Sequence, residues 1–264
     1  MIFENRFFTL VCIIFVCFTS KSYSQNSKKF DLSISFGLNT SFLIGKGVDE
    51  YKLFLDQSME PYSQLGVNWS NYFIPRIGLS SGLIAECLLT DNFGFKTGFN
   101  FSQRGFAFKQ EWELPSDNSE ISSLNYKFQE LTNVHLNYLD YPILLTRKLN
   151  NKSSIALGGI LSFILIDNVI VNTMEEYQTY DTNGNIQLII DESRVNGNYK
   201  GLISDDSPDF ILGGLCLEFN YKIKRLGVSS RVTRYSSVGT LNGASNNNKN
   251  LVFNISLSYK IKKT

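Results

Sequence analysis

Apolar and polar residues alternate with a period of two along most of the chain. In the segment FDLSISFGLN (30–39), every second residue from Phe30 is apolar, and each residue between is small or polar. A helix would spread these apolar side chains around its circumference, whereas a strand places them on one face. The pattern therefore predicts a strand with one apolar and one polar face.

The same alternation predicts about seven further strands. They cover residues 76–89, 93–104, 135–147, 154–166, 210–221, 226–235 and 251–261. Short turns near residues 91, 150 and 223 join strands into hairpins, and the segments between hairpins are much longer. These long segments are 41–72, 109–133, 167–209 and 236–249. We expect 41–72 to be a long mixed loop, and 167–209 to carry a projecting hairpin with strands at 169–173 and 186–190.

About eight strands with alternating short and long connections predict an all-β fold, a transmembrane antiparallel up-and-down β-barrel. Apolar residues are expected to face lipid, and glycine, serine and charged residues to face a narrow lumen filled by side chains. We expect both chain ends and the short turns on the periplasmic side, with the long loops outside the cell. A soluble barrel or sandwich would bury these apolar faces and would not need such regular alternation of connections.

The first 24 residues predict a cleaved signal peptide. The apolar run Phe7–Phe18 is too short to span a bilayer comfortably as a helix, and Ser22-Tyr23-Ser24 has the small-x-small pattern of a cleavage site. We expect the mature chain to begin at Gln25 and to form a single barrel domain over 25–264. A retained membrane anchor is the alternative.

Composition narrows the class of protein further. The net charge of +1 disfavours a nucleic-acid binder, and 21 phenylalanines with 13 tyrosines suit an aromatic-girdled membrane barrel. Cys87 and Cys216 lie outside the predicted signal peptide, each within an apolar strand pattern. We expect them to act as small apolar residues, although an exported protein permits a disulfide. No Cys/His cluster is evident, so no metal or cofactor is expected.

Three strand motifs together carry a resemblance to a known family. They are YLDYPILL at 138–145, GFKTGFNFSQRG at 94–105 and RVTRY at 231–235. These motifs resemble the YLEIPLLLK, FGFQTGLLYSQKG and RY-containing strands of the PorT-like outer-membrane β-barrel family. The resemblance spans essentially the whole mature chain and implies a small outer-membrane barrel, usually of unassigned activity. The C-terminal YKIKKT departs from the terminal aromatic residue that the barrel-insertion machinery often reads.

Charged residues on the predicted lumen face are the candidate site residues. They are Arg76, Glu86, Lys96, Arg104, Asp140, Glu218 and Arg231. Opposite charges in a low-dielectric interior are expected to pair, because a buried unpaired charge costs several kcal/mol. A structural network of ion pairs is therefore the expected role. A binding site or a narrow conduit for a small polar solute is the alternative.

Other candidate residues are less specific. His135, the only histidine, is expected at the outer rim of its strand, and no nucleophile that could work with it is evident nearby. The segment DTNGN (181–185) lacks EF-hand spacing and is expected to be a turn. Loop aromatic residues are expected at the membrane interface, with partner binding as the alternative. They are Tyr51, Tyr62, Trp69, Trp112, Tyr177 and Tyr180.

Together these patterns predict a non-enzymatic barrel of the cell outer membrane with a narrow or plugged lumen. It would act through its extracellular loops, in envelope structure, adhesion or partner docking. A passive porin-like channel for small solutes is the first alternative, and a membrane-embedded hydrolase that depends on His135 is the second. Expected partners are outer-membrane lipid and lipopolysaccharide, the barrel-insertion machinery during biogenesis, and an extracellular or envelope protein.

Overall fold

The computed structural model describes residues 30–64, 66–114, 126–180, 186–197, 211–235 and 249–263. The predicted signal peptide and the predicted turn at 181–185 lie outside these residues. Within them are nine strands and one helix. The elements are β1 (Phe30–Ile44), α2 (Lys46–Ser63), β2 (Asn68–Leu88), β3 (Phe93–Leu114), β4 (Tyr126–Lys148), β5 (Ser153–Tyr180), β6 (Ile186–Gly197), β7 (Ile211–Ile223), β8 (Leu226–Tyr235) and β9 (Lys249–Lys263).

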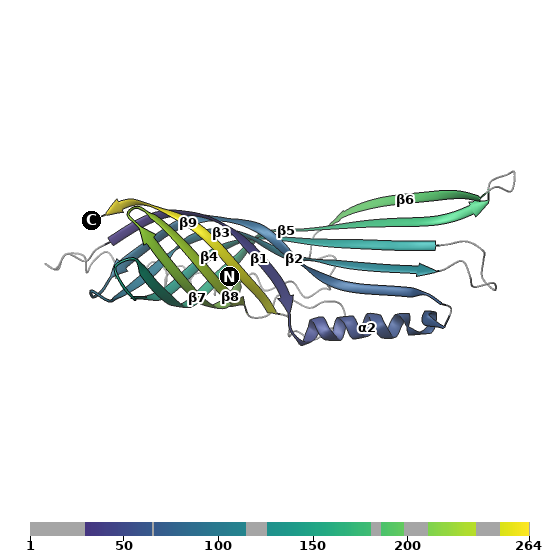
Figure 1. The fold of residues 1–264 in the computed structure, drawn as a ribbon, viewed down its shortest axis with the longest axis horizontal. Coiled ribbons are helices and arrows are strands. Elements are labelled where there is room, and N and C mark those ends of the chain that lie inside the picture. The colour runs from purple at the N-terminus through teal and green to yellow at the C-terminus, as the bar shows by residue number, and fades with distance from the viewer. Residues whose placement is uncertain are drawn as a thin grey trace, which may run out of the picture.

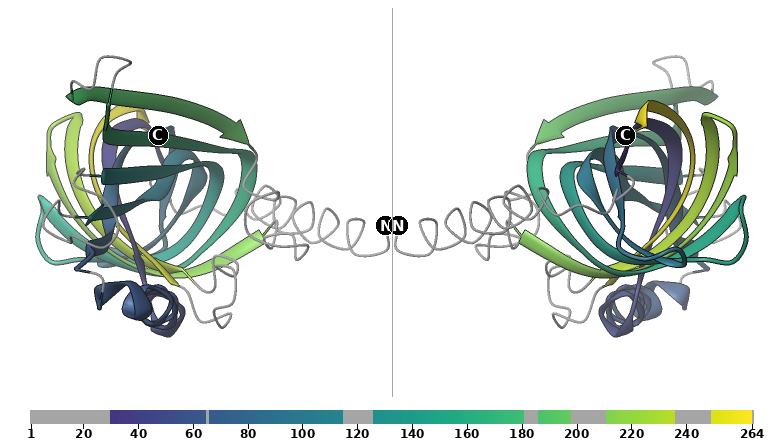
Figure 2. Two further views of the ribbon diagram at one scale, coloured as in Figure 1. Left: turned by 90° about the vertical axis from the view of Figure 1, so that its right-hand side faces the viewer. Right: turned by 90° about the vertical axis from the view of Figure 1, so that its left-hand side faces the viewer.

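Eight of these strands close into an antiparallel barrel (Figures 1 and 2). The order around the ring is β1-β2-β3-β4-β5-β7-β8-β9, and β9 pairs back with β1. Ring neighbours also follow one another in the chain, except that β6 stands between β5 and β7 in sequence. The structure therefore confirms the predicted up-and-down barrel.

The two faces of the barrel wall follow the alternation in the sequence. On the outward face, Phe36 is 65% exposed and Leu215 is 76% exposed, whereas the inward residues Ser35 and Cys216 are buried. Such a band of exposed apolar side chains would be unfavourable in water but is what the lipid-facing wall of a membrane barrel requires. The predicted assignment of faces is confirmed.

One end of the barrel carries the short turns. Residues 89–92, 149–152 and 224–225 join β2 to β3, β4 to β5 and β7 to β8. In the second turn the Asn150 Oδ1 atom accepts hydrogen bonds from the backbone N–H groups of Lys152 and Ser153, both at 2.8 Å. Asp31 near the start of β1 pairs with Lys263 at the end of β9, so both strand ends lie at this same end.

Four barrel strands continue past the other end of the barrel and form a projecting sheet together with β6 (Figure 1). This outer sheet consists of residues 68–75 of β2, 105–114 of β3, 126–134 of β4, 169–180 of β5 and all of β6. β6 pairs with the outer part of β5, which confirms the predicted projecting hairpin and lengthens it. The prediction of a loop through 109–133 is wrong, because the strand ladder continues at both ends of this segment.

Helix α2 replaces most of the loop that the sequence predicts at 41–72. Tyr51 packs against Phe73 of β2 and Phe108 of β3, with ring centroids 6.4 and 5.4 Å apart. Asn71 Nδ2 donates a hydrogen bond of 3.2 Å to the Asp56 Oδ1 atom, so the helix lies along the outer part of β2 (Figure 1). Among the described residues, no helix combines the length and the hydropathy needed to cross a membrane.

Irregular pairing marks the level at which the outer sheet leaves the barrel. The β2–β3 register shifts between Pro75 and Ser80, and the β4–β5 register shifts between Asn137 and Tyr138. Gly105 of β3 lies at the same level with a φ of 141°. Bulges of this kind bend a strand and increase its twist, which lets these strands depart from the closed ring.

Candidate functional site

Arg104 of β3 points into the lumen and is almost completely buried. Its Nε atom donates a hydrogen bond of 2.9 Å to Ser102 Oγ, and its Nη2 atom forms an ion pair with Asp140 Oδ2. The Ser162 hydroxyl donates to the other Asp140 oxygen at 2.6 Å. Both charges are therefore compensated, as a buried ion pair requires.

Two tyrosine rings pack against the Arg104 guanidinium. Its central carbon lies 4.6 Å from the Tyr138 ring centroid and 4.1 Å from that of Tyr235. Tyr235 belongs to β8, which stands opposite β3 in the eight-strand ring. The Arg104–Tyr235 contact therefore crosses the lumen and closes it at this level, whereas Tyr138 belongs to the neighbouring strand β4.

Glu218 of β7 organises a second group of charges. Its carboxylate accepts a hydrogen bond of 2.7 Å from Arg231 Nε and forms an ion pair with Lys96 Nζ. Lys96 also donates to Asn220 Oδ1 at 3.1 Å. Arg231 is the cross-strand neighbour of Glu218 on β8, whereas Lys96 reaches across the lumen from β3.

Amide and hydroxyl groups form a third group, which the sequence analysis missed. Asn254 Nδ2 donates to Asn39 Oδ1 at 2.6 Å and to Ser80 Oγ at 2.8 Å. Asn39 Nδ2 in turn donates to Ser102 Oγ at 2.8 Å. Their only sequence signal is an inward position in an alternating strand, which dozens of other residues share.

The remaining predicted lumen charges lie apart from these groups. Glu86 forms an ion pair with Lys222, toward the short-turn end, and not with its cross-strand neighbour Lys96. Arg76 is half-buried, and its Nη1 atom donates to the Val134 carbonyl at 3.2 Å. Within the described part of the chain Arg76 forms no ion pair, so the seven predicted residues do not form one network.

Apolar residues close the outer end of the barrel above these polar groups. Leu43, Phe106, Val134 and Val169 are buried together with Val48 from the first turn of α2. The lumen is therefore filled in succession by an apolar cluster, the Arg104 group and the Glu218 group. This filling is what an eight-stranded barrel is expected to show.

His135 does not lie at the rim of its strand, because β4 begins nine residues earlier at Tyr126. It is half-buried between the inward, buried residues Val134 and Leu136, which places it on the outward face. Cys87 and Cys216 are both free thiols. Cys216 points into the lumen and is buried, whereas Cys87 lies on the outward face of β2. The two thiols therefore lie on opposite sides of the barrel wall and cannot form a disulfide.

A row of aromatic residues crosses the face of the outer sheet that continues the lumen face. Trp69 and Trp112 lie directly opposite each other on β2 and β3. Trp112 stacks on Tyr126 and Phe128 of β4 at 4.8 and 5.4 Å, and Tyr126 stacks on Tyr177 of β5 at 6.2 Å. Partial burial raises the pKa of Tyr126, and its hydrogen bond to Glu175 adds to this rise.

This aromatic row lies well outside the barrel. Trp112 follows Gly105 by seven residues, or about 23 Å of extended strand. That distance does not fit the predicted location at the membrane interface for Trp69, Trp112 and Tyr177. Tyr51 also departs from that prediction, because it packs between α2 and the sheet.

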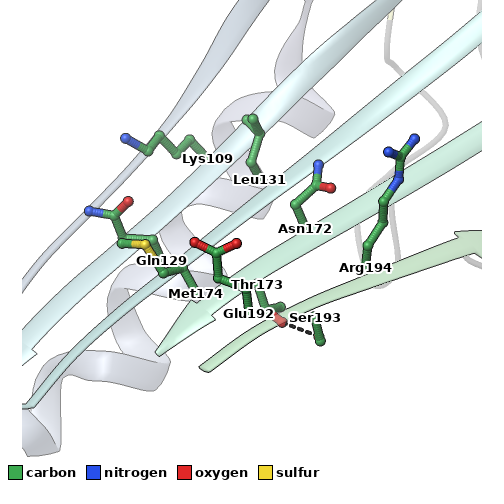
Figure 3. A pocket seen from close by; sticks show the side chains of 9 residues that line it. All are labelled: Lys109, Gln129, Leu131, Asn172, Thr173, Met174, Glu192, Ser193 and Arg194. Carbon is green, nitrogen blue, oxygen red and sulfur yellow. Dashed lines mark hydrogen bonds between the residues drawn. The ribbon is translucent and has the colours of Figure 1, made fainter. Parts of the chain in front are cut away.

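The opposite face of the outer sheet is hollowed (Figure 3). One shallow hollow of about 550 Å³ extends over β3, β4, β5 and β6. Its lining residues are Lys109, Gln129, Leu131, Asn172, Thr173, Met174, Glu192, Ser193 and Arg194. Lys109 forms an ion pair of 2.7 Å with Glu111, and this hydrogen-bonded partner raises the pKa of its ammonium group. A smaller hollow of about 250 Å³ lies beside Trp69 and Trp112.

The chain is similar to several solved outer-membrane proteins at low sequence identity. Ail, the attachment invasion locus protein of Yersinia pestis, is 12% identical, covering 89% of this chain and 100% of that chain, with a TM-score of 0.36. Neisserial surface protein A is 10% identical, covering 87% and 97% of the two chains, with a TM-score of 0.34. LpxR from Salmonella typhimurium is 9% identical, covering 86% and 100%, with a TM-score of 0.26. No curated protein sequence matches the chain.

The family assignment comes from the sequence as a whole. The family model described as "Outer membrane protein beta-barrel domain" matches residues 23–259, which include all of β1 to β8 and most of β9. Its strands and its lipid-facing apolar band are those of a closed membrane barrel. The protein therefore belongs to the outer membrane protein beta-barrel domain family and is a barrel of the outer membrane.

Proposed function

We propose that the protein is a non-enzymatic outer-membrane barrel with a plugged lumen, acting through its outer sheet and α2 in adhesion or partner docking. The observation that carries this proposal is the contrast between the two parts of the molecule. The lumen is filled by buried ion pairs, one of which crosses it from β3 to β7, whereas the outer sheet presents half-buried aromatic residues and two hollows.

The buried charges argue against a passive channel. A solute that passed through the lumen would separate Lys96 on β3 from Glu218 on β7, and Arg104 on β3 from Tyr235 on β8. Removing one partner of a buried ion pair costs about 3–5 kcal/mol, so each of these levels is a barrier. The lumen therefore serves the stability of the barrel in this proposal.

The outer sheet has the composition of an interaction surface. Tyrosine and tryptophan supply large contact areas and are enriched among the residues that dominate binding energies. In this proposal the partner is an extracellular or envelope protein, and lipopolysaccharide surrounds the barrel. We further infer that the chain is a PorT-like member of its family, from the motifs at 94–105, 138–145 and 231–235, and that residues 1–24 direct its export.

Electrical recording in planar bilayers tests the plugged lumen. The wild-type protein should give no steady conductance above that of the protein-free bilayer. A variant that loses both Lys96 and Glu218, to alanine, should conduct more than the wild type, because it removes contacts that cross the lumen. Steady conductance of the folded wild type would contradict the proposal and favour a passive channel for small solutes.

Retention of bacteria that display the protein tests the role of the outer sheet. Cells are washed over glass coated with outer-membrane fragments from the same displaying strain. The double variant Trp69→Ser/Trp112→Ser should reduce retention, because it removes the two tryptophans of the aromatic row. Glu86→Gln, near the opposite end of the barrel, is the control and should retain cells as well as wild type at equal surface level. Equal retention by the tryptophan variant would contradict the proposal.

A further inference from the structure

Strand β6 forms an open edge of the outer sheet. It pairs only with β5 within the described part of the chain, and this pairing runs over all twelve residues without a register shift. Natural proteins usually protect such an edge with proline, with charged residues, above all lysine, with a bulge or with a covering element. The β6 sequence IQLIIDESRVNG contains neither proline nor lysine.

The other edge of the same sheet is covered. Residues 68–75 of β2 pair only with β3, and α2 lies along them through the Tyr51–Phe73 contact and the Asn71–Asp56 hydrogen bond. Lys52 also lies 5.9 Å from the Phe73 ring centroid. Among the described residues, a helix therefore packs beside one edge strand of the outer sheet, whereas no element packs on the β6 edge.

Exposed side chains on β6 are both apolar and charged. Leu188 is 52% exposed, Ile190 56% and Val195 61%. Glu192 and Arg194 are exposed, lie on the same face and form no ion pair among the described residues (Figure 3). An edge with these side chains can add another strand through its backbone hydrogen bonds, with charge pairs fixing the register.

We propose that β6 pairs in antiparallel fashion with β6 of a second copy of this protein, with Ser193 opposite Ser193 of the other copy. This inference rests on the proposed function and names its partner. In this register Glu192 of each copy lies opposite Arg194 of the other, so the pairing contains two complementary charge pairs. Opposite charges directly across two strands stabilise the pairing, and like charges destabilise it.

Charge complementarity selects both the partner and the register. When a two-fold axis perpendicular to the sheet relates two antiparallel strands, residues directly opposite each other must point to the same face. The axis must therefore pass between two copies of the same residue, which is the centre of the pairing. Centres at Asp191, Glu192 or Arg194 place that charge opposite its own copy. Of these four neighbouring centres, Ser193 alone avoids a like-charge contact and satisfies both charges.

The antiparallel direction sets the relative orientation of the two barrels. The two-fold axis stands perpendicular to the joined sheet, so the two copies run in opposite directions along their strands. The outer sheet projects from the barrel along the long axis of the molecule (Figure 1). The two barrels therefore lie in opposing membranes, and the contact joins two cells or vesicles. Each contact is weak, but many copies on facing membranes act together.

Aggregation of proteoliposomes tests this pairing with a charge exchange. The full-length protein is reconstituted as wild type, Glu192→Arg, Arg194→Glu or the double variant, and aggregation is followed by light scattering. Wild-type and double-variant vesicles should aggregate, and each single variant alone should aggregate about tenfold less, because both pairs become like-charged on many contacts at once. Mixing Glu192→Arg vesicles with Arg194→Glu vesicles should restore aggregation, because the two surfaces are then complementary.

The outcomes separate this inference from the proposed function. Equal aggregation of all four proteins, or failure of the mixture to aggregate, would overturn the β6 pairing. Vesicles that do not aggregate while displaying cells are retained on envelope fragments would overturn the pairing and leave the proposed function standing. Loss of both responses would overturn both. A faster gel mobility before boiling than after confirms that each variant is folded.

Discussion

Glu218 has two cationic partners, so single substitutions in this group should differ in their effect on the stability of the barrel. Arg231→Ala leaves Glu218 paired with Lys96, whereas Glu218→Ala leaves two buried cations without a counter-charge. We expect Glu218→Ala to destabilise the barrel by about 3–5 kcal/mol and Arg231→Ala by less. The urea midpoint of the gel-mobility change in detergent measures both. Unchanged stability of Arg231→Ala with altered solute flux would favour a conduit over a structural network.

At the residue scale, the sequence predicts which side chains face the lumen but not which of them meet. Alternation alone places Lys96, Arg104, Asp140, Glu218 and Arg231 inward, and all five are buried. Lys96 nevertheless pairs with Glu218, 122 positions away, and not with its strand neighbour Glu86. That choice depends on ring closure and on the stagger between strands, neither of which a periodic pattern contains.

At the element scale, Gly105 sits where β3 passes from the barrel into the outer sheet. Its positive φ is unfavourable for other residues, and a Cβ atom there would collide with the Val134 carbonyl oxygen. Gly105→Ala should therefore lower the free energy of unfolding by more than about 1 kcal/mol. Gly159→Ala is the matched control, since its Cβ would meet only the Gly214 carbonyl oxygen, at 3.7 Å. Equal urea midpoints for the two variants would contradict this reading of the junction.

Docking of α2 on the outer sheet should depend on alkaline pH through Tyr51. Burial raises the pKa of this phenol, and the nearby Glu130 carboxylate raises it further. Because the folded-state pKa lies above the unfolded value near 10, the stabilising contribution is complete below about pH 10 and falls as pH rises beyond it. Between about pH 8 and pH 11, the urea midpoint from tryptophan fluorescence should therefore fall further for wild type than for Tyr51→Phe. Identical falls would show that Tyr51 does not link α2 docking to pH.

Helix α2 was not predicted because its apolar residues follow the helical period and not the period of two that marks the strands. Val48, Tyr51, Leu55 and Met59 are spaced as one face of a helix, and the first of them is buried. The outer parts of β3 and β4 carry their aromatic residues on the face that continues the lumen face, and their other face is mainly polar because it lies outside the membrane. A pattern that identifies strands by a lipid-facing apolar side cannot detect strands that have left the lipid.

At the scale of the whole molecule, the barrel and the outer sheet should differ in stability. The barrel is closed and lipid-embedded, with a filled lumen, whereas the outer sheet, as far as the structure describes it, is one layer with an open edge and a single helix beside it. A layer of this kind buries less apolar surface per residue and opens at lower free energy. The two parts should therefore unfold in separate steps.

The two tryptophans provide a probe that is specific for the outer sheet. Trp69 and Trp112 are the only tryptophans in the chain, and both lie in this sheet. Fluorescence should therefore report the outer sheet alone, while gel mobility without boiling reports the barrel. We expect the fluorescence transition in urea at a lower concentration than the mobility transition, and the order should persist in Trp69→Phe and Trp112→Phe. Coincident transitions would show that the outer sheet and the barrel form one cooperative unit. In that case substitutions at the junction, such as Gly105→Ala, should shift both transitions together.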